Sequence, residues 1–357
     1  MIKILELARP DILSLKPYEH AAWQPTLERM HANEMPWRAN GDDTRAGLNR
    51  YPEPQPREIL DRLAQLYQVR REQVLVGRGS DEGIDLLIRA FCRAGQDRVL
   101  ICPPTFGMYK VAARIQGADV LEVPLLKERG FALDENAVLR AAPDVKLIFL
   151  CTPNNPTANL LDATVIERLC GALQDRALIV VDEAYIEFAG CPSFAARIEE
   201  FQNLVVLRTL SKAYALAGAR CGTVIAHPEI ISLLARIIPP YALSTSTIET
   251  VLAVTDARGQ AASQERIRTV LEERERLRVG LARLPLIQKV WSSDSNFLLV
   301  DCVDADRVLN AAIDSRLIIR DPRSQRGLER SVRISVGTPE QNSRLLRGVA
   351  AASGVAA

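Results

Sequence analysis

Lys212 combines a reactive amine with neighbours that could hold a phosphorylated ligand. Ser211 precedes it, Arg220 follows eight residues later in a Gly/Ala-rich segment, and an apolar run at 204–207 leads into it. Ser211 and Arg220 are suited to binding a phosphate, the arginine through charge-assisted hydrogen bonds. A lysine amine can form a Schiff base with an aldehyde on the same ligand. A single Ser-Lys pair is more often an exposed lysine after a strand, so this hypothesis depends on the rest of the chain.

Asp182 offers a partner for the ring of such a ligand, because it directly follows the apolar run 177–181 and Tyr185 stands three residues later. A carboxylate there can keep the nitrogen of a pyridine ring protonated, which makes the ring of pyridoxal phosphate an electron sink. A rival interpretation is the Walker B acidic residue of an ATPase. That interpretation requires a Gly-x-x-x-x-Gly-Lys-Ser/Thr loop, which this sequence lacks. A strand that simply ends in acidic residues remains a third interpretation of this feature alone.

Three further turns follow predicted strands. The Gly-rich turn at 77–83 opens a helix, so the amides of Gly79 and Ser80 are candidate phosphate donors. Asn155, in a turn stiffened by two prolines, could donate to a phenolic oxygen, as could Tyr185. Phe106, after two prolines, offers an aromatic face for stacking on a ring. Taken singly, the Gly-rich turn is more often an ordinary strand-to-helix turn, the Asn-Pro turn is as often a surface turn, and a lone phenylalanine is more often a core residue. The Gly-rich turn is also not a dinucleotide-binding Gly-x-Gly-x-x-Gly pattern.

The elements that must position these residues form an α/β domain. Short apolar runs alternate with amphipathic stretches such as 83–92 and 165–173, which predicts a mostly parallel seven-stranded sheet covered by helices on both faces. We place this large domain at residues 46–243. Ligands bind at the carboxyl ends of such strands, where the candidate residues fall. The seven predicted strands are 73–76, 98–102, 120–123, 146–151, 177–181, 204–207 and 222–226.

A smaller α+β domain is predicted at residues 244–357. Its expected elements are a long Arg/Glu-rich helix at 264–283, a helix at 307–315, another after Pro339, and strands near 296–300, 317–320 and 332–336. Residues 1–45 lack clear periodicity, and we expect this N-terminal segment to pack on the smaller domain or on a partner subunit.

Composition narrows the classes of function. The 357 residues include 45 Lys+Arg against 44 Asp+Glu, which gives no electrostatic reason to expect nucleic acid or an anionic membrane as partner. The seven cysteines form no Cys-x-x-Cys pair, so neither a disulfide framework nor a structural metal site is expected. This cysteine usage, together with an N-terminus that lacks an apolar signal core, predicts a cytoplasmic protein.

The order of these motifs resembles that of the fold-type-I aminotransferases, which use pyridoxal phosphate, and within them the histidinol-phosphate aminotransferases. The resemblance covers nearly the whole chain. It is carried by Leu-Asn-Arg-Tyr-Pro at 48–52, Asp-Glu-Gly-Ile at 81–84, Cys-Pro-Pro-Thr-Phe-Gly-Met-Tyr at 102–109, Asp-Glu-Ala-Tyr-Ile-Glu-Phe at 182–188 and Leu-Arg-Thr-Leu-Ser-Lys at 207–212.

The resemblance implies a role for each matching residue. Lys212 would form the Schiff base and then act as general acid and base, and Asp182 would pair with the ring nitrogen. Around the cofactor would stand Asn155 and Tyr185 at the ring oxygen, Phe106 on the ring face, Thr209 nearby, and Ser211, Arg220, Gly79, Ser80 and Asp81 at the phosphate. Tyr51 would reach the cofactor of the neighbouring subunit, which implies a homodimer. On the substrate side, Arg333 would clamp a carboxylate and Arg320 and Tyr18 would lie near a phosphate.

The resemblance favours transamination between L-histidinol phosphate and 2-oxoglutarate. An L-threonine phosphate decarboxylase and an aromatic amino-acid aminotransferase remain alternatives, because the same arginines suit another phosphorylated or anionic substrate. A non-catalytic pyridoxal-phosphate regulator would need an added DNA-binding module, which neither the length nor the net charge leads us to expect. The chain departs from the family pattern at Ala158, where glycine is usual, and at Ala219, where a larger apolar residue is common.

Overall fold

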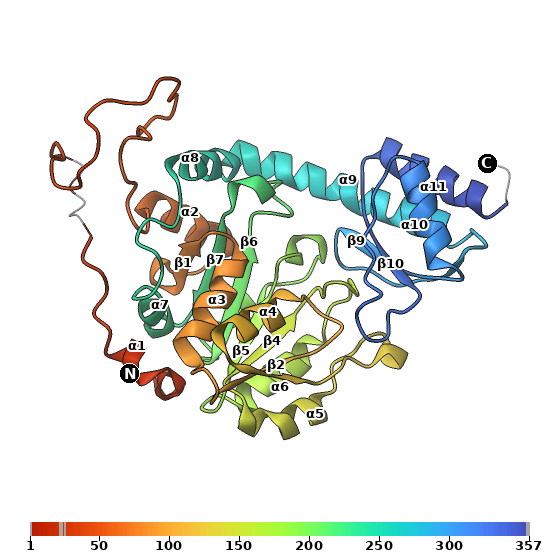
Figure 1. Cartoon of the computed structure of the whole chain (residues 1–357), viewed down its shortest axis with the longest axis horizontal. Coiled ribbons are helices and arrows are strands. Elements are labelled where there is room, and N and C mark those ends of the chain that lie inside the picture. Colours follow the sequence, from red (N-terminus) through yellow and green to blue (C-terminus); the bar gives the residue numbers. More distant parts are fainter. Residues whose placement is uncertain (1, 21–23, 25, 355–357) are drawn as a thin grey trace.

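The computed structural model describes residues 2–20, 24 and 26–354, which form two domains joined by a long helix (Figure 1). The larger domain holds a seven-stranded sheet in the order β1-β7-β6-β5-β4-β2-β3. Strand β7 is antiparallel to both of its neighbours and the other pairs are parallel, which confirms the predicted α/β fold. The strands are β1 (Val74–Gly77), β2 (Arg98–Ile101), β3 (Asp119–Glu122), β4 (Leu147–Cys151), β5 (Leu178–Asp182), β6 (Leu204–Thr209) and β7 (Gly222–Ala226).

Both faces of this sheet are buried, which explains why its central strands are continuously apolar. In β5, Leu178 and Val180 belong to the core on one face, while Ile179 and Val181 belong to the core on the other. Residues of α3 (Ser80–Phe91), α4 (Met108–Gln116) and α7 (Pro228–Leu234) complete the first core. Residues of α2 (Arg57–Tyr67), α5 (Glu135–Ala141), α6 (Ala163–Ala172) and α8 (Thr245–Val254) complete the second.

The smaller domain is α+β, as predicted. Its antiparallel sheet has the order β10-β9-β8, and helices α9, α10 and α11 contribute to the core on one face. The elements are α9 (Ala257–Leu281), β8 (Ile287–Val290), β9 (Phe297–Cys302), α10 (Ala305–Asp314), β10 (Ser331–Ser335) and α11 (Pro339–Ala352).

The strand predicted at 317–320 is wrong. Only Arg320 pairs there, in a single bridge to Arg333, and Ile318 is 94% exposed. The third strand is instead β8, whose exposed Gln288 and Lys289 interrupt the apolar pattern that the prediction required.

The two domains share a core at their seam. Phe297 and Leu299 of β9 belong to the same buried cluster as the large-domain residues around Phe131, and Trp291 packs on Phe131 with ring centroids 4.7 Å apart. The backbone N–H of Asp294 donates to the carbonyl of Ala158 at 2.8 Å. Ala158 is buried and has a φ of 67°, so the turn adopts a left-handed conformation without glycine. The small domain is therefore anchored beside the Asn-Pro turn of the candidate site.

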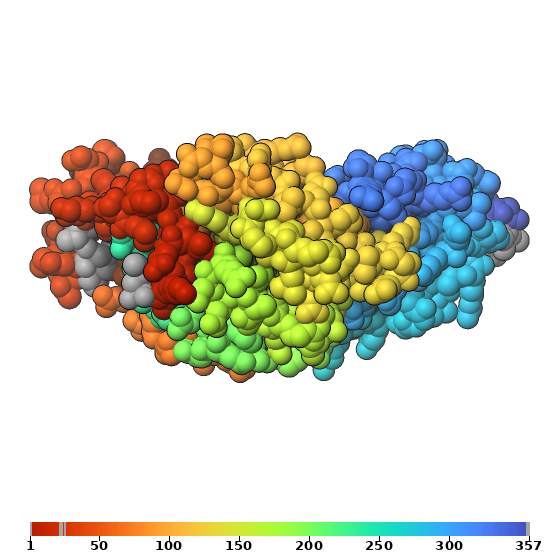
Figure 2. All heavy atoms as spheres, turned by 90° about the horizontal axis from the view of Figure 1, so that it is seen from below, coloured from red at the N-terminus to blue at the C-terminus, as the bar shows by residue number. Residues whose placement is uncertain are grey.

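The described N-terminal residues do not pack on the smaller domain. Ile4, Leu5 and Ile12 lie in the core that α3 and α7 complete, and the N–H of Arg9 donates to the carbonyl of Ala90 at 2.9 Å. For residues 2–13 that alternative is wrong, because these apolar side chains extend the first core of the large domain. Figure 2 shows the N-terminal residues gathered at one end of the molecule and the small domain at the other. The domain boundaries at residues 45 and 243 stay predictions.

Candidate active site

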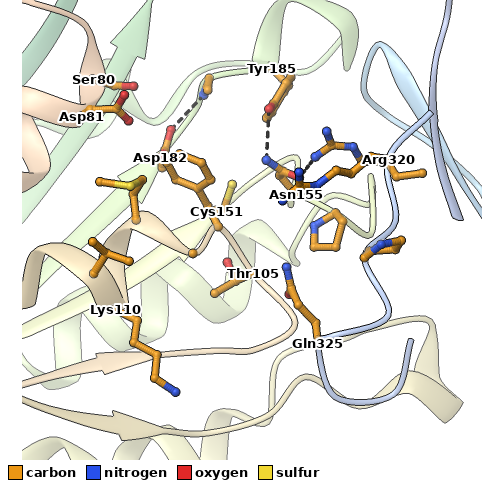
Figure 3. Close-up of a pocket in the computed structure, with 18 of the residues that line it drawn as sticks. Ser80, Asp81, Thr105, Lys110, Cys151, Asn155, Asp182, Tyr185, Arg320 and Gln325 are labelled. Atoms are coloured by element: carbon orange, nitrogen blue, oxygen red, sulfur yellow. Dashed lines mark hydrogen bonds between the residues drawn. The ribbon is translucent and has the colours of Figure 1, made fainter. Parts of the chain in front are cut away.

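A cavity of about 920 Å³ lies where strands β4, β5 and β6 end, at the seam between the domains. Cys151, Asp182 and Thr209, the last residues of these strands, all line it. Figure 3 shows Asp182, Tyr185 and Asn155 around this space, with Arg320 and Gln325 also in view. All predicted site residues except Tyr18 and Tyr51 line the cavity: Gly79, Ser80, Asp81, Phe106, Asn155, Asp182, Tyr185, Thr209, Ser211, Lys212, Arg220, Arg320 and Arg333.

Asp182 places a buried negative charge in this cavity. Its side chain is held from two sides: the N–H of Ala184 donates to Oδ1 at 3.1 Å, and the hydroxyl of Tyr109 donates to Oδ2 at 2.7 Å. Burial raises the pKa of Asp182 to about 6, although both hydrogen bonds favour the ionised form. A protonated ring nitrogen that reached this carboxylate would relieve the unfavourable burial of its charge, so the site fits a pyridinium.

A hydrogen-bonded chain links the small domain to the large one at the cavity wall. Arg333 of β10 donates from Nη1 to Oδ1 of Asn155 at 2.5 Å, and Asn155 donates from Nδ2 to the hydroxyl of Tyr185 at 3.3 Å (Figure 3 shows the Tyr185–Asn155 bond). Arg333 also lies over the ring of Phe297, with Cζ 5.2 Å from the centroid. Its buried Nε has no hydrogen-bond partner in the described structure. Arg333 therefore retains a donor for an anionic ligand.

The turn before α3 and the start of β7 form a close-fitting cradle. Gly79 has a φ of 86°, and a Cβ atom added to it would lie 2.8 Å from Nη2 of Arg220. A Cβ atom on Gly222 would lie 2.3 Å from the backbone of Gly79 and Ser80. Because α3 begins at Ser80, its first amides lie at the positive end of the helix dipole. The cradle has the donors and the backbone space that a phosphate needs.

Ser211 and Arg220 stand beside this cradle, and Asp81 modifies its charge. Thr209 donates from Oγ1 to Oγ of Ser211 at 3.0 Å, which fixes the serine at the cavity edge. Arg220 has a left-handed backbone and lies 3.4 Å from the carboxylate of Asp81. This partly exposed ion pair is weak, so it leaves the guanidinium able to turn to a stronger anion.

Lys212 enters the cavity from a tight loop whose ends are fixed. Buried Leu210 donates to the carbonyl of Cys221 at 3.1 Å and accepts from the N–H of Leu216 at the same distance. The lysine Nζ lies 5.7 Å from the ring centroid of Tyr185. Burial, assisted by the positive charge of Arg333, lowers the pKa of Lys212, which increases the fraction of neutral amine that can attack a carbonyl.

Tyr18 and Tyr51 lie outside this cavity. Tyr18 is 68% exposed and borders a separate groove with His20 and Arg236. Tyr51 is half exposed and stacks on Tyr241, with ring centroids 4.5 Å apart. Within one chain, Tyr18 does not reach this cavity, and its predicted place near a substrate phosphate stays a prediction. The predicted role of Tyr51 was toward a neighbouring subunit.

Sequence reasoning missed several residues that line the cavity or contact its lining. Tyr109 was part of a recognised motif but received no role, although its hydroxyl contacts Asp182 directly. Lys110 and Glu122 form an ion pair of 2.6 Å at the edge of the cavity, and Gln325 lines its small-domain side. The one available signal for Tyr109 was its position three residues after Phe106, in the first turn of the helix that follows.

The sequence of this chain matches a known protein family. Residues 25–349 match the family described as aminotransferase class I and II. The chain therefore belongs to the class I and II aminotransferases.

Curated relatives narrow this placement to one group within the family. The chain is 44% identical over 353 residues to a histidinol-phosphate aminotransferase of Stenotrophomonas maltophilia (strain R551-3), which covers 98% of this chain and 97% of that protein. It is 39% identical over 353 residues to the histidinol-phosphate aminotransferase of Escherichia coli (strain SMS-3-5 / SECEC), with 97% of each chain covered. These similarities place it among the histidinol-phosphate aminotransferases, which confirms the resemblance seen in the sequence.

A solved structure supports the fold. The histidinol-phosphate aminotransferase of Sinorhizobium meliloti in complex with pyridoxal-5′-phosphate superposes with a TM-score of 0.76 and 23% identity, covering 85% of this chain and 83% of that chain. The shared architecture is the two-domain fold of this class.

We predict that Asp182→Asn stabilises the ligand-free chain while weakening its hold on a cofactor. Because the folded-state pKa of Asp182 is raised above its unfolded value, the folded chain binds more protons between about pH 4 and about pH 6 and loses stability as pH rises through this range. At pH 7, the variant should unfold with a free energy about 2 kcal/mol higher than the unmodified chain, as measured by urea unfolding. Near pH 4, where Asp182 is protonated, the difference should largely disappear. A variant that is less stable at pH 7 than at pH 4, relative to the unmodified chain, contradicts this assignment.

Proposed function

We propose that this chain transfers an amino group between L-histidinol phosphate and 2-oxoglutarate, giving imidazole acetol phosphate and glutamate, with pyridoxal phosphate as cofactor. The observation that carries the proposal is one cavity that holds Lys212, buried Asp182, a phosphate cradle and two further arginines. The curated relatives at 39–44% identity support the choice of reaction.

The cavity residues suit pyridoxal phosphate in both shape and charge. When bound, this cofactor supplies an aldehyde that condenses with amines and a ring that withdraws electrons. Asp182 would hold the ring nitrogen, and Asn155 and Tyr185 would donate to the ring oxygen. Gly79, Ser80, Ser211 and Arg220 would bind the phosphate, with Asp81 and Thr209 beside them and Phe106 against the ring. The absence of a Cβ at Gly79 and Gly222 supports this assignment, because a Cβ at Gly79 would collide with the Arg220 guanidinium and one at Gly222 would collide with the backbone of Gly79 and Ser80.

Lys212 would move the proton that amino transfer requires. Its lowered pKa increases the fraction of neutral amine, and a neutral Nζ can both attack a carbonyl and accept a proton from carbon. The loop that carries Lys212 is fixed at both ends, so the amine is presented from one direction. The negative charge of Asp182 would pair with the protonated ring nitrogen. The ring could then accept the electrons that remain after proton removal.

Two arginines would distinguish the substrates. Arg333 has the planar donor set that binds a carboxylate through two hydrogen bonds, and its Nε is unused in the described structure. Arg320 lines the same cavity and forms no ion pair within the described part of the chain, which suits it to a substrate phosphate. Arg333 also donates to Asn155, so a substrate bound by Arg333 would directly affect Asn155, one of the donors to the ring oxygen.

We predict a clear order of substrate preference. Offered histidinol phosphate, phenylalanine and threonine phosphate separately with 2-oxoglutarate, the purified protein should form glutamate fastest from histidinol phosphate. Arg320→Gln should reduce kcat/KM for histidinol phosphate by about 100-fold and for phenylalanine by much less, because only the former carries a phosphate. Glutamate formation and carbon dioxide release are measured together. Carbon dioxide release from threonine phosphate as the fastest reaction would show a decarboxylase and refute the transaminase.

We infer further that the active unit is a homodimer with shared cavities. Tyr51 is exposed outside the cavity of its own chain, where a second copy could receive it. Large apolar side chains of the preceding segment are also exposed, including Met30 at 96% and Trp37 at 75%. Exposure of this kind over one segment is typical of a surface that another chain covers.

We predict complementation between two impaired chains. Lys212→Ala removes the amine and Tyr51→Phe removes the hydroxyl offered to the partner, so a mixed dimer should contain one complete cavity. Activity per mole of Lys212 should rise after the two variants are unfolded together and refolded. As control, the double variant Lys212→Ala/Tyr51→Phe, mixed with Tyr51→Phe, should give no rise. A monomer in sedimentation, or equal activity in both mixtures, contradicts the shared cavity.

We propose the cytoplasm as the compartment. All seven cysteines are free, and six of them are buried, which suits a reducing environment. Within the described residues, no helix combines the length and apolar character needed to cross a membrane.

A further inference from the structure

Tyr109 is a buried polar group whose hydroxyl contacts Asp182, a cavity residue, and which the proposed reaction leaves without a role. Its side chain is fully buried in α4, and its ring stacks on Phe149 with centroids 4.9 Å apart. Phe106 meets the same ring edge-on at 5.6 Å. These contacts fix the ring, so its hydroxyl has one position, 2.7 Å from Oδ2 of Asp182.

The hydrogen bond from Tyr109 is one of two that fix the Asp182 carboxylate. The other comes from the backbone of Ala184 to Oδ1, so each carboxylate oxygen has one donor and a remaining lone pair. A carboxylate held at both oxygens cannot rotate about its Cβ–Cγ bond without breaking a hydrogen bond. Tyr109 thus determines which direction is left open for a ligand in the cavity.

We propose that Tyr109 is a positioning residue for the cofactor: its hydroxyl orients the Asp182 carboxylate and stabilises the negative charge that holds the ring nitrogen. This inference rests on the proposed pyridoxal-phosphate function. Tyr109 itself acts only through Asp182, because Tyr109 is not among the residues that line the cavity.

The charge environment makes this hydrogen bond necessary. Burial raises the pKa of Asp182, and nearby Asp81 raises it further, whereas Lys212 lowers it. Cys151 and Tyr185 also face the carboxylate, but burial raises the pKa of both, so both are neutral near pH 7. Tyr109 is then the side chain within hydrogen-bonding distance that favours ionised Asp182. Without its hydroxyl, the carboxylate would be protonated at a higher pH and would hold a ring nitrogen less firmly.

A pair of tyrosine variants tests this role. Tyr109→Phe keeps the stacked ring and removes the hydroxyl. Tyr67→Phe is the matched control, because Tyr67 is also buried in a large-domain helix but its hydroxyl has no hydrogen-bond partner within the described residues. Each protein is loaded with pyridoxal phosphate, and cofactor retention is followed by visible absorbance and dialysis across pH. Urea unfolding of the ligand-free chains at about pH 8 and about pH 5 gives a second readout that needs no cofactor.

Tyr109→Phe should bind pyridoxal phosphate about ten-fold more weakly than the unmodified chain at about pH 8. As the pH is lowered, the variant should release the cofactor at a pH about one unit higher than the unmodified chain does, because Asp182 is protonated earlier. Tyr67→Phe should stay within about two-fold of the unmodified chain. In the ligand-free chain, the fall in urea midpoint caused by Tyr109→Phe should be larger at the higher pH, where Asp182 is ionised.

Equal cofactor retention and an equal pH profile in the two variants would overturn the role of Tyr109. Failure of the unmodified chain to take up pyridoxal phosphate would instead contradict the proposed function. The ligand-free unfolding then still reports whether the Tyr109 hydroxyl stabilises ionised Asp182.

Discussion

The burial of one carboxylate, Asp182, at the end of a central strand is the constraint on which the rest of the site depends. The fold places it at the carboxyl end of β5, flanked by β4 and β6 and covered on both faces of the sheet. An isolated charge there is unfavourable, and two hydrogen bonds only partly offset this, as its raised pKa indicates. A site that is destabilised when empty gains most from a ligand that brings the opposite charge.

The seam between the domains would, under the proposed function, join cofactor binding to substrate binding. Arg333 belongs to the small sheet, but it reaches across the seam to Asn155, which in turn contacts Tyr185. The shared core around Phe297 and Trp291 holds the small sheet in place against the large domain. A substrate carboxylate that draws Arg333 toward itself would therefore alter the donors around the ring oxygen. Under the proposed function, recognition of substrate and activation of cofactor would use the same hydrogen-bonded chain.

Much of this architecture could be predicted from the sequence, because strands buried in the large sheet have short, continuous apolar runs. All seven strands of the large sheet were found this way, and the residues following them converge at one edge. Strand β8 was missed because exposed Gln288 and Lys289 break its apolar pattern. Helix α9 begins at Ala257, where Asp256 caps its first turn, and not at the predicted residue 264. The prediction missed these first turns because they carry few apolar residues. The role of Tyr109 was hidden because a buried aromatic on a helix has the same sequence pattern as ordinary core. The position of Tyr18 depends on where an aperiodic segment runs, which local patterns do not determine.

The central claim is that the amine of Lys212 forms the covalent link to the cofactor. The most direct measurement is borohydride reduction of the protein loaded with pyridoxal phosphate, followed by peptide mass analysis, with Lys110 and Lys127 as internal comparisons. The account predicts a pyridoxyl group on the peptide that contains Lys212, close to one per chain, and none after Lys212→Ala. Modification of another lysine in preference to Lys212, or no reducible adduct at all, would contradict it.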